Sequence, residues 1–311
     1  MAALVDVALP FFGLIFCGYA ALAGKLVGPT AVEGLNAFVY HFALPALLFV
    51  KVGTTPLAEL FDWRFFAAFY GVAFALWIAT SALARWRFGL PFAEAAVAGV
   101  GGIWTNSGYM GIPLLITAMG SDAALPAVLA LTFDNLITAP ILIMILEARS
   151  GRGRGRLATL RNVARNLARN PLVLAVFAGF AWTLTGLPVP TPLGNFAGLL
   201  GAAAAPCALF ALGASLVGAP IAAARAEILT FATIKLVVHP ALMALTVLWL
   251  LPLRPELALA TIVTASLPTG ASVFVLAERY ATYTIRASSL VLVTHAASVV
   301  TVTAVLVWAT G

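Results

Sequence analysis

The segment "WTNSGYMGIPLL", residues 104–115, lies inside an apolar run long enough to cross a membrane. Eight of its residues, Asn106 to Pro113, include two glycines, a proline, an asparagine and a serine. Glycine and proline are the poorest helix formers, so this composition predicts a break in the helix. In hydrocarbon, unpaired backbone groups are costly, and a non-helical stretch survives only where protein buries it or where it lines a wet cavity. The break is therefore a candidate functional position.

The composition indicates a polytopic membrane protein. Of 311 residues, 63% are hydrophobic and 9% are charged, too few charges for the surface of a water-soluble domain. A crossing helix needs about 20 mostly apolar residues, which predicts an all-α fold with ten transmembrane helices. The first one is interpreted as a retained helix, because its apolar stretch is too long for a signal peptide. The predicted spans are residues 4–24, 33–52, 65–85, 92–118, 123–147, 170–187, 195–218, 228–251, 256–277 and 285–309.

Basic residues are distributed unequally between the two sides of the membrane. On one side we expect Lys25, Arg85, Arg87, the seven arginines from Arg149 to Arg169, Arg225, Arg279 and Arg286. The positive-inside rule makes that side cytoplasmic, so both termini are expected to face outward. Nucleic-acid binding explains the net charge of +6 poorly, because no aromatic residues are interleaved with the basic ones.

A basic linker, residues 148–169, separates residues 1–147 from residues 170–311, and each part holds five predicted spans. Two interpretations of the linker stay open, a short helix on anionic headgroups and a solvated connector. Because five is odd, the two parts would enter the membrane from opposite sides. A shared fold would make them inverted repeats.

Matches between the two parts favour such repeats. "LPALLF" at residues 44–49 matches "APCALF" at residues 205–210, with the proline in register. The break in the fourth span has a counterpart in the ninth, "TASLPTGAS" at residues 264–272. Asp134 in the fifth span has His295 as its approximate counterpart in the tenth. Paired broken helices in inverted halves indicate a transport site.

The two breaks offer groups that suit an anion. Pro113 and Pro268 are each expected near the start of a second half-helix, where a missing N–H costs little. The exposed N–H groups and partial positive charge of a helix start favour an anion. Asn106, Ser107 and Tyr109 can form hydrogen bonds, and glycines allow close approach of the backbone. The predicted substrate-binding residues are Asn106, Ser107, Gly108, Tyr109, Pro113, Ser266, Pro268, Thr269 and Gly270.

Ionisable side chains at membrane depth are costly and are functional candidates by default. Asp134 lies near the middle of the fifth span, and His295 is similarly deep. Lys235 and His239 lie four residues apart on one face of the eighth span and could supply positive charge to an anion or pair with Asp134. All four are candidates for proton or ion coupling, against structural hydrogen bonding or snorkelling of Lys235. His41 is a weaker candidate.

Enzymatic function has little support. HExxH, GxSxG, CxxC and Walker motifs are absent from the sequence, so we expect neither catalysis nor a metal or other cofactor. Cys17 and Cys207 lie in apolar spans and predict neither a disulfide nor a metal site.

Three segments resemble the auxin efflux carrier family, which includes plant PIN auxin exporters and bacterial malonate and malate carriers. They are "TNSGYMGIPLL" at residues 105–115, "KLVVHPAL" at residues 235–242 and "TASLPTGASVFVLAERY" at residues 264–280. The resemblance implies two inverted five-helix repeats, related to the fold of sodium and bile acid symporters, in which helices 4 and 9 are broken and cross near the substrate. It also implies a scaffold of helices 1, 2, 6 and 7 that forms a homodimer, and a transport domain of helices 3–5 and 8–10. The short linker favours a bacterial or short-form member.

The expected function is secondary transport of a small organic anion across the cytoplasmic membrane by an elevator mechanism. The anion would be an auxin-like monocarboxylate or a dicarboxylate such as malonate or malate, and protons or the membrane potential would drive its movement. Two alternatives are a sodium-coupled symporter and, in another class, a membrane sensor that binds a solute.

Overall fold

In this computed structural model, the described residues are 9–56, 62–149, 161, 164–165, 167–218 and 224–310. Most of the basic linker lies outside them. Within these ranges the chain is helical, with one isolated bridge between extended residues. The helices of the first half are α1 (Leu9–Ala23), α2 (Pro29–Phe38), α3 (Leu44–Gly53), α5 (Trp63–Phe88), α6 (Phe92–Gly101), α7 (Ile112–Met119), α8 (Leu125–Phe133) and α9 (Ala139–Arg149). Those of the second half are α11 (Pro171–Leu184), α12 (Thr191–Ala202), α13 (Ala204–Ser215), α14 (Arg225–Thr233), α15 (His239–Leu245), α16 (Pro255–Ser266), α17 (Ser272–Arg279) and α18 (Thr284–Thr310).

Several of these helices join into longer apolar rods. Among the described residues, six rods are long and apolar enough to cross a membrane: Pro29–Gly53, Trp63–Phe88, Ser121–Glu147, Thr191–Ser215, Arg225–Leu250 and Thr284–Ala309. The prediction of an all-α membrane protein is confirmed. The count of ten spans stays a prediction, because the remaining apolar helices are shorter than a full crossing.

Within the rods, proline repeatedly follows a turn of π-helix. The described chain has five such turns: η2 (Val39–Ala43), η3 (Ser107–Gly111), η5 (Asp134–Thr138), η6 (Ile234–Val238) and η7 (Thr246–Leu250). A proline stands two residues after the end of each turn. Proline has no N–H, and its ring collides with the carbonyl four residues earlier, so the preceding turn widens to i→i−5 bonds such as Ile112 N–H to Ser107 O. The widened turns contain Tyr109, Asp134 and Lys235.

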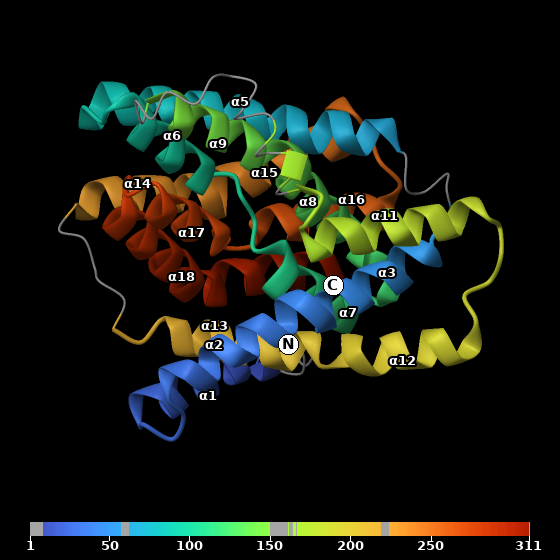
Figure 1. Ribbon diagram of the computed structural model, residues 1–311. Coiled ribbons are helices and arrows are strands. Elements are labelled where there is room, and N and C mark those ends of the chain that lie inside the picture. Colours follow the sequence, from blue (N-terminus) through green and yellow to red (C-terminus); the bar gives the residue numbers. More distant parts are fainter. Residues whose placement is uncertain are drawn as a thin grey trace.

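The helices form two groups (Figure 1). The helices α1–α3 and α11–α13, coloured blue and yellow, pack together, with α1, α2, α12 and α13 at the bottom of the view; the remaining helices, α5–α9 and α14–α18, form the second group, with α5, α6 and α9 at the top. Within the first group, α1 packs on α13 and α3 packs on α11. The two groups meet where η3 contacts α13 and where α8 contacts α11.

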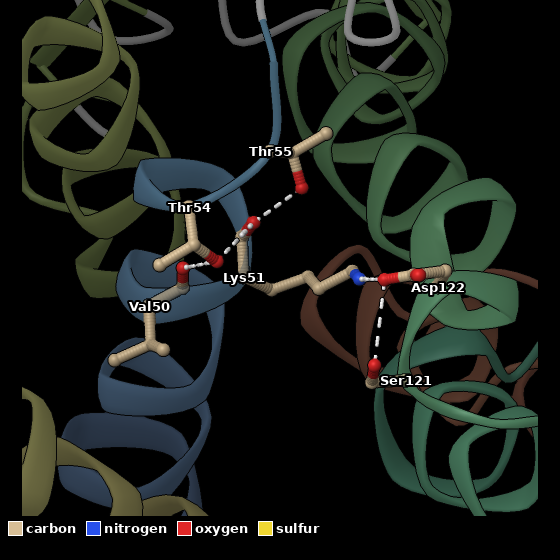
Figure 2. Close-up of polar contacts among 6 residues, drawn as sticks. All are labelled: Val50, Lys51, Thr54, Thr55, Ser121 and Asp122. Atoms are coloured by element: carbon tan, nitrogen blue, oxygen red, sulfur yellow. Dashed lines mark hydrogen bonds and ion pairs between the residues drawn. The ribbon is translucent and has the colours of Figure 1, made fainter. Parts of the chain in front are cut away.

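Two polar contacts also join the groups. Lys51 extends from the end of α3 to Asp122, at the start of the α8 rod in the 3₁₀ turn η4 (Ser121–Ala124), and its Nζ lies 2.9 Å from Oδ1 of Asp122 (Figure 2). The second contact runs from Nδ2 of Asn170, before α11, to Oδ1 of Asn135 at 3.1 Å. Both contacts use the rod of residues 121–147.

Glycines bring α1 and α13 into backbone contact. A Cβ atom added to Gly18 would lie 1.9 Å from the carbonyl oxygen of Phe210, and one added to Gly213 would lie 1.8 Å from that of Ile15. Small residues at helix interfaces allow this close packing in membranes, where burial from water contributes little. A side chain at either position would force the helices apart.

We therefore expect Gly18→Ala to destabilise the protein by about 1 to 3 kcal/mol, the usual cost of overpacking. Gly13→Ala in the same helix is the matched control, because nothing lies within 4 Å of a Cβ at that position. The measurement is unfolding in mixed detergent micelles. Equal stability of the two variants would contradict the packing described for α1 and α13.

Candidate functional site

The two helix breaks pair with each other. Thr105, after α6, and Thr269, after α16, form an isolated antiparallel bridge. The N–H of Asn106 donates to the carbonyl of Pro268 at 2.9 Å, and the N–H of Gly270 donates to the carbonyl of Trp104 at 3.0 Å. Each break therefore supplies hydrogen-bond partners that the other lacks, as backbone groups at membrane depth require.

Threonine side chains complete this pairing. The hydroxyl of Thr269 donates to the carbonyl of Gly101, the last residue of α6, at 2.8 Å. The N–H of Thr269 donates to the hydroxyl of Thr294 on α18 at 3.2 Å. Thr294 was not predicted as a site residue, because a threonine in an apolar helix has no local feature that distinguishes it. The Ser266 hydroxyl donates to the carbonyl of Val263 at 2.7 Å, so the hydroxyl protons of Ser266 and Thr269 are both already used within the protein.

The predicted positions of the two prolines have different outcomes. Pro113 is the second residue of α7, as expected for the start of a half-helix. The expectation for Pro268 is wrong, because α17 begins four residues later, at Ser272. The residue before a proline is driven towards extended backbone, and Leu267 has φ −58° and ψ 150°. This extended conformation lets Pro268 take part in the bridge.

Glycines at the breaks serve contacts between the two breaks. A Cβ atom on Gly111 would lie 2.5 Å from Cδ1 of Leu267, and one on Gly270 would lie 3.1 Å from the carbonyl oxygen of Thr105. Glycines at these positions are expected to let the backbone approach another group closely. In the structure, that group is the segment of the other break.

Asn106 connects the break to α18. Its side chain is 3% exposed, and its Nδ2 lies 2.9 Å from Nε2 of His295. His295 Nδ1 lies 2.8 Å from the carbonyl oxygen of Val291, which can only accept a hydrogen bond. Nδ1 therefore carries the proton, and Nε2 accepts from the amide of Asn106, so the imidazole is neutral in this arrangement. A second proton on His295 would require the Asn106 amide to turn its oxygen towards the ring.

In the part of the chain that the structure describes, the first turn after the bridge has N–H groups without an acceptor. Ser107, Gly108 and Tyr109 are the first residues of the η3 turn, and the first N–H groups of a helix have no acceptor inside it. The Asn106 side chain does not cap this turn. The hydroxyls of Thr105 and Ser107 hydrogen-bond to each other. Three N–H groups therefore directly follow Asn106 in the chain, at the level of the bridge.

A second polar cluster contains the other ionisable candidates. Oδ1 of Asp134, which is 4% exposed, accepts from the Thr138 hydroxyl at 3.0 Å. Lys235 Nζ lies 3.3 Å from Nδ1 of His239. Asp134 and Lys235 lie near each other on the rods of residues 121–147 and 225–250, without a direct ion pair between these two described residues. His41 belongs to neither cluster, because it is exposed beside the ring of Tyr40.

A family model described as "Membrane transport protein" matches residues 4–306. The chain belongs to this family, that of the auxin efflux carriers. It is similar to a Rhizobium meliloti protein named "Putative malonate transporter", with 36% identity over 98% of this chain and 96% of that protein. It is also similar to the Escherichia coli "Uncharacterized transporter YfdV", with 25% identity over 89% of this chain and 88% of that protein.

A mouse protein named "Lysosomal cholesterol signaling protein" is 26% identical over 68% of this chain, but the match covers only 25% of that protein. The family and the relatives named as transporters indicate a membrane transporter, with no indication of an enzyme. The predicted family is thus confirmed.

The Thr269 hydroxyl bond can be tested by replacement with a residue of the same shape. Thr269→Val leaves the Gly101 carbonyl without its side-chain donor, and we expect a loss of about 1 to 3 kcal/mol in stability. Thr233→Val is the control, since the Thr233 hydroxyl is exposed and bonds to Leu229 within its own helix. Unfolding in mixed micelles measures both, and a Thr269 variant as stable as the control would contradict the role assigned to this hydroxyl.

Proposed function

We propose that this protein is a secondary transporter that moves a small organic anion with one or two carboxylates. The pairing of the two helix breaks carries this proposal. It holds Asn106 beside three unpaired N–H groups deep in the apolar bundle, where desolvated donors bind an anion strongly. The relative named for malonate supports a dicarboxylate.

In this proposal the Asn106 amide and the N–H groups of Ser107, Gly108 and Tyr109 hold a carboxylate. Pro113 favours the half-helix whose start presents these groups. Ser266, Pro268, Thr269 and Gly270 contribute mainly by building the opposite side of the bridge.

Inverted repeats are part of the proposal, and packing in the first helix group supports them. Gly179 on α11 approaches the carbonyl of Phe49 on α3, with its added Cβ 2.8 Å from that oxygen, just as Gly18 approaches Phe210. Gly179 and Phe210 lie 161 residues after Gly18 and Phe49, and His295 lies 161 residues after Asp134. One constant offset relates two packing contacts and the paired ionisable residues. Two copies of one five-helix unit would have this property.

An elevator mechanism accounts for the two helix groups. In it, α1–α3 and α11–α13 form the scaffold, which dimerises, and the other helices form the transport domain. The protein lies in the cytoplasmic membrane with both termini outside and the basic linker inside. Sliding of one group along the other would break both the Lys51–Asp122 and the Asn170–Asn135 contacts.

Protons and the membrane potential are the proposed driving forces. Protonation of His295 would reorient Asn106, the residue proposed to hold the anion, and Asp134 is the second proton-coupling candidate. A potential of 100 mV acts on one charge with about 2.3 kcal/mol, enough to expel an anion without a coupled ion. Sodium symport is the alternative. A solute sensor, the alternative from another class, would bind the anion without moving it.

The function is tested by uptake of radiolabelled malonate into proteoliposomes, with and without sodium and at two pH values. We expect uptake that Asn106→Ala lowers by tenfold or more, because losing a hydrogen bond to a charged group costs about 1.5 to 3 kcal/mol. Asn195→Ala is the control, since this exposed asparagine on α12 lies away from the bridge. Sodium-dependent uptake would favour the alternative. Binding of malonate without uptake would indicate a sensor, and equal uptake by both variants would remove Asn106 from the site.

The elevator motion is tested at the contact in Figure 2. In a background with Cys17 and Cys207 replaced by serine, we introduce Lys51→Cys and Asp122→Cys and join them with a reversible bis-methanethiosulfonate linker. We expect linking to abolish uptake and reduction to restore it, because the linker fixes the two groups against each other. The single-cysteine variants are the controls. Full uptake by the linked protein would contradict sliding between these groups.

A further inference from the structure

Lys235 lies inside the protein at membrane depth with 0% of its surface exposed. Placing a lysine there is costly, so its charge and hydrogen bonds must have partners. Its Nζ donates to the carbonyl of Ala265, in the last turn of α16, at 2.8 Å. We infer that Lys235 is a positioning residue. It holds the end of α16 in the geometry that lets the two breaks pair, and it does not touch the transported anion.

The carbonyl of Ala265 needs a donor from outside its own helix. In a continuous helix the N–H of Thr269, four residues on, would bind it. That N–H donates to the hydroxyl of Thr294, and the N–H of Gly270 donates to Trp104. The break therefore frees the carbonyl at the end of α16, and Lys235 replaces the lost donor.

A cation suits this position better than a neutral donor. The carbonyl end of a helix has a partial negative charge, and its attraction for a cation is screened little where water is absent. Lys235 lies in the widened η6 turn, five residues before Pro240. The break after α16 is thus supported from η6 as well as from the break after α6.

The hydrogen-bond partners of Lys235 come from the protein itself. Nδ1 of His239 faces the ammonium at 3.3 Å and accepts its second hydrogen bond, so Nε2 of His239 carries the ring proton. Among the described atoms, Nε2 has no hydrogen-bond partner, and the His239 ring lies against Phe69. Asp134, on the rod of residues 121–147, supplies an opposite charge nearby, without a direct ion pair between these two described residues. Both hydrogen bonds that the structure shows for Lys235 are thus made within the protein.

This assignment deepens the proposed function, because it concerns the same paired breaks. It differs from the expected coupling role of Lys235 in a testable way. A positioning residue affects every substrate equally and changes the backbone near Ala265. A ligand for the anion would discriminate between substrates of different charge.

The test is hydrogen exchange of the protein in nanodiscs, followed by mass spectrometry of peptides that cover residues 264–271. We expect exchange on the order of tenfold faster in Lys235→Met, the factor that losing one buried hydrogen bond predicts. Lys235→Gln, which keeps a donor without the charge, should show a smaller increase. Lys51→Met, which removes the lysine of the other helix group, is the matched control and should leave this segment unchanged.

Hydrogen exchange in the break after α16 is measured without substrate, so the result stands even if the protein does not transport malonate. Unchanged exchange in a folded Lys235→Met protein would overturn the assignment. If Lys235→Met does not fold, the double variant Lys235→Met with Asp134→Asn replaces it, because the second change removes the carboxylate that the lost lysine leaves uncompensated. Its exchange is then compared with that of Asp134→Asn alone.

Uptake supplies the second measurement. Lys235→Met should lower uptake of a monocarboxylate and of a dicarboxylate by the same factor and leave the shape of the pH profile unchanged. A much larger loss for the dicarboxylate would identify Lys235 as a ligand of the anion. A flattened pH profile would identify it as a coupling residue, and either result would overturn the positioning role.

Discussion

Every backbone N–H and C=O at membrane depth needs a partner, and the arrangement of this protein follows from how that requirement is met where two helices stop. The segments after α6 and α16 could not persist separately in hydrocarbon. Together they form an antiparallel bridge in which Asn106 donates to Pro268 and Gly270 donates to Trp104. Side chains supply donors to two further carbonyls, Thr269 to Gly101 and Lys235 to Ala265. The breaks are therefore stable only as a pair.

Proline contributes to the same region without breaking the rods. A proline in a straight helix removes one hydrogen bond and collides with the preceding turn. Here a preceding π-helical turn absorbs that conflict locally, so that a rod such as Arg225–Leu250 continues through Pro240, although it ends before Pro252. The widened turns also contain Asp134 and Lys235. These ionisable side chains thus lie where the helix is already irregular, as is common for π turns at functional sites.

The two polar clusters differ in what their residues are free to do. His295 and Asn106 share one hydrogen bond whose direction reverses when the ring gains a proton. In the other cluster, Lys235 is fixed by hydrogen bonds to a carbonyl and a ring nitrogen from within the protein, with the carboxylate of Asp134 nearby. Ionisable residues at membrane depth are functional candidates on cost alone. Their contacts separate a residue that can respond to its surroundings from one that supports the backbone.

The amino-acid sequence by itself determined the class of protein, the family and the places where helices stop. Those properties depend on composition and on local rules, such as the glycines and proline of residues 106–113. The same rules misplaced Pro268, because its extended conformation is needed for pairing with a segment more than 150 residues earlier. Only the tertiary structure decided that Asn106 meets His295, that Thr294 binds the Thr269 amide and that Lys235 caps α16. These contacts join residues on different helices, and their geometry depends on how the helices pack, which no local pattern specifies.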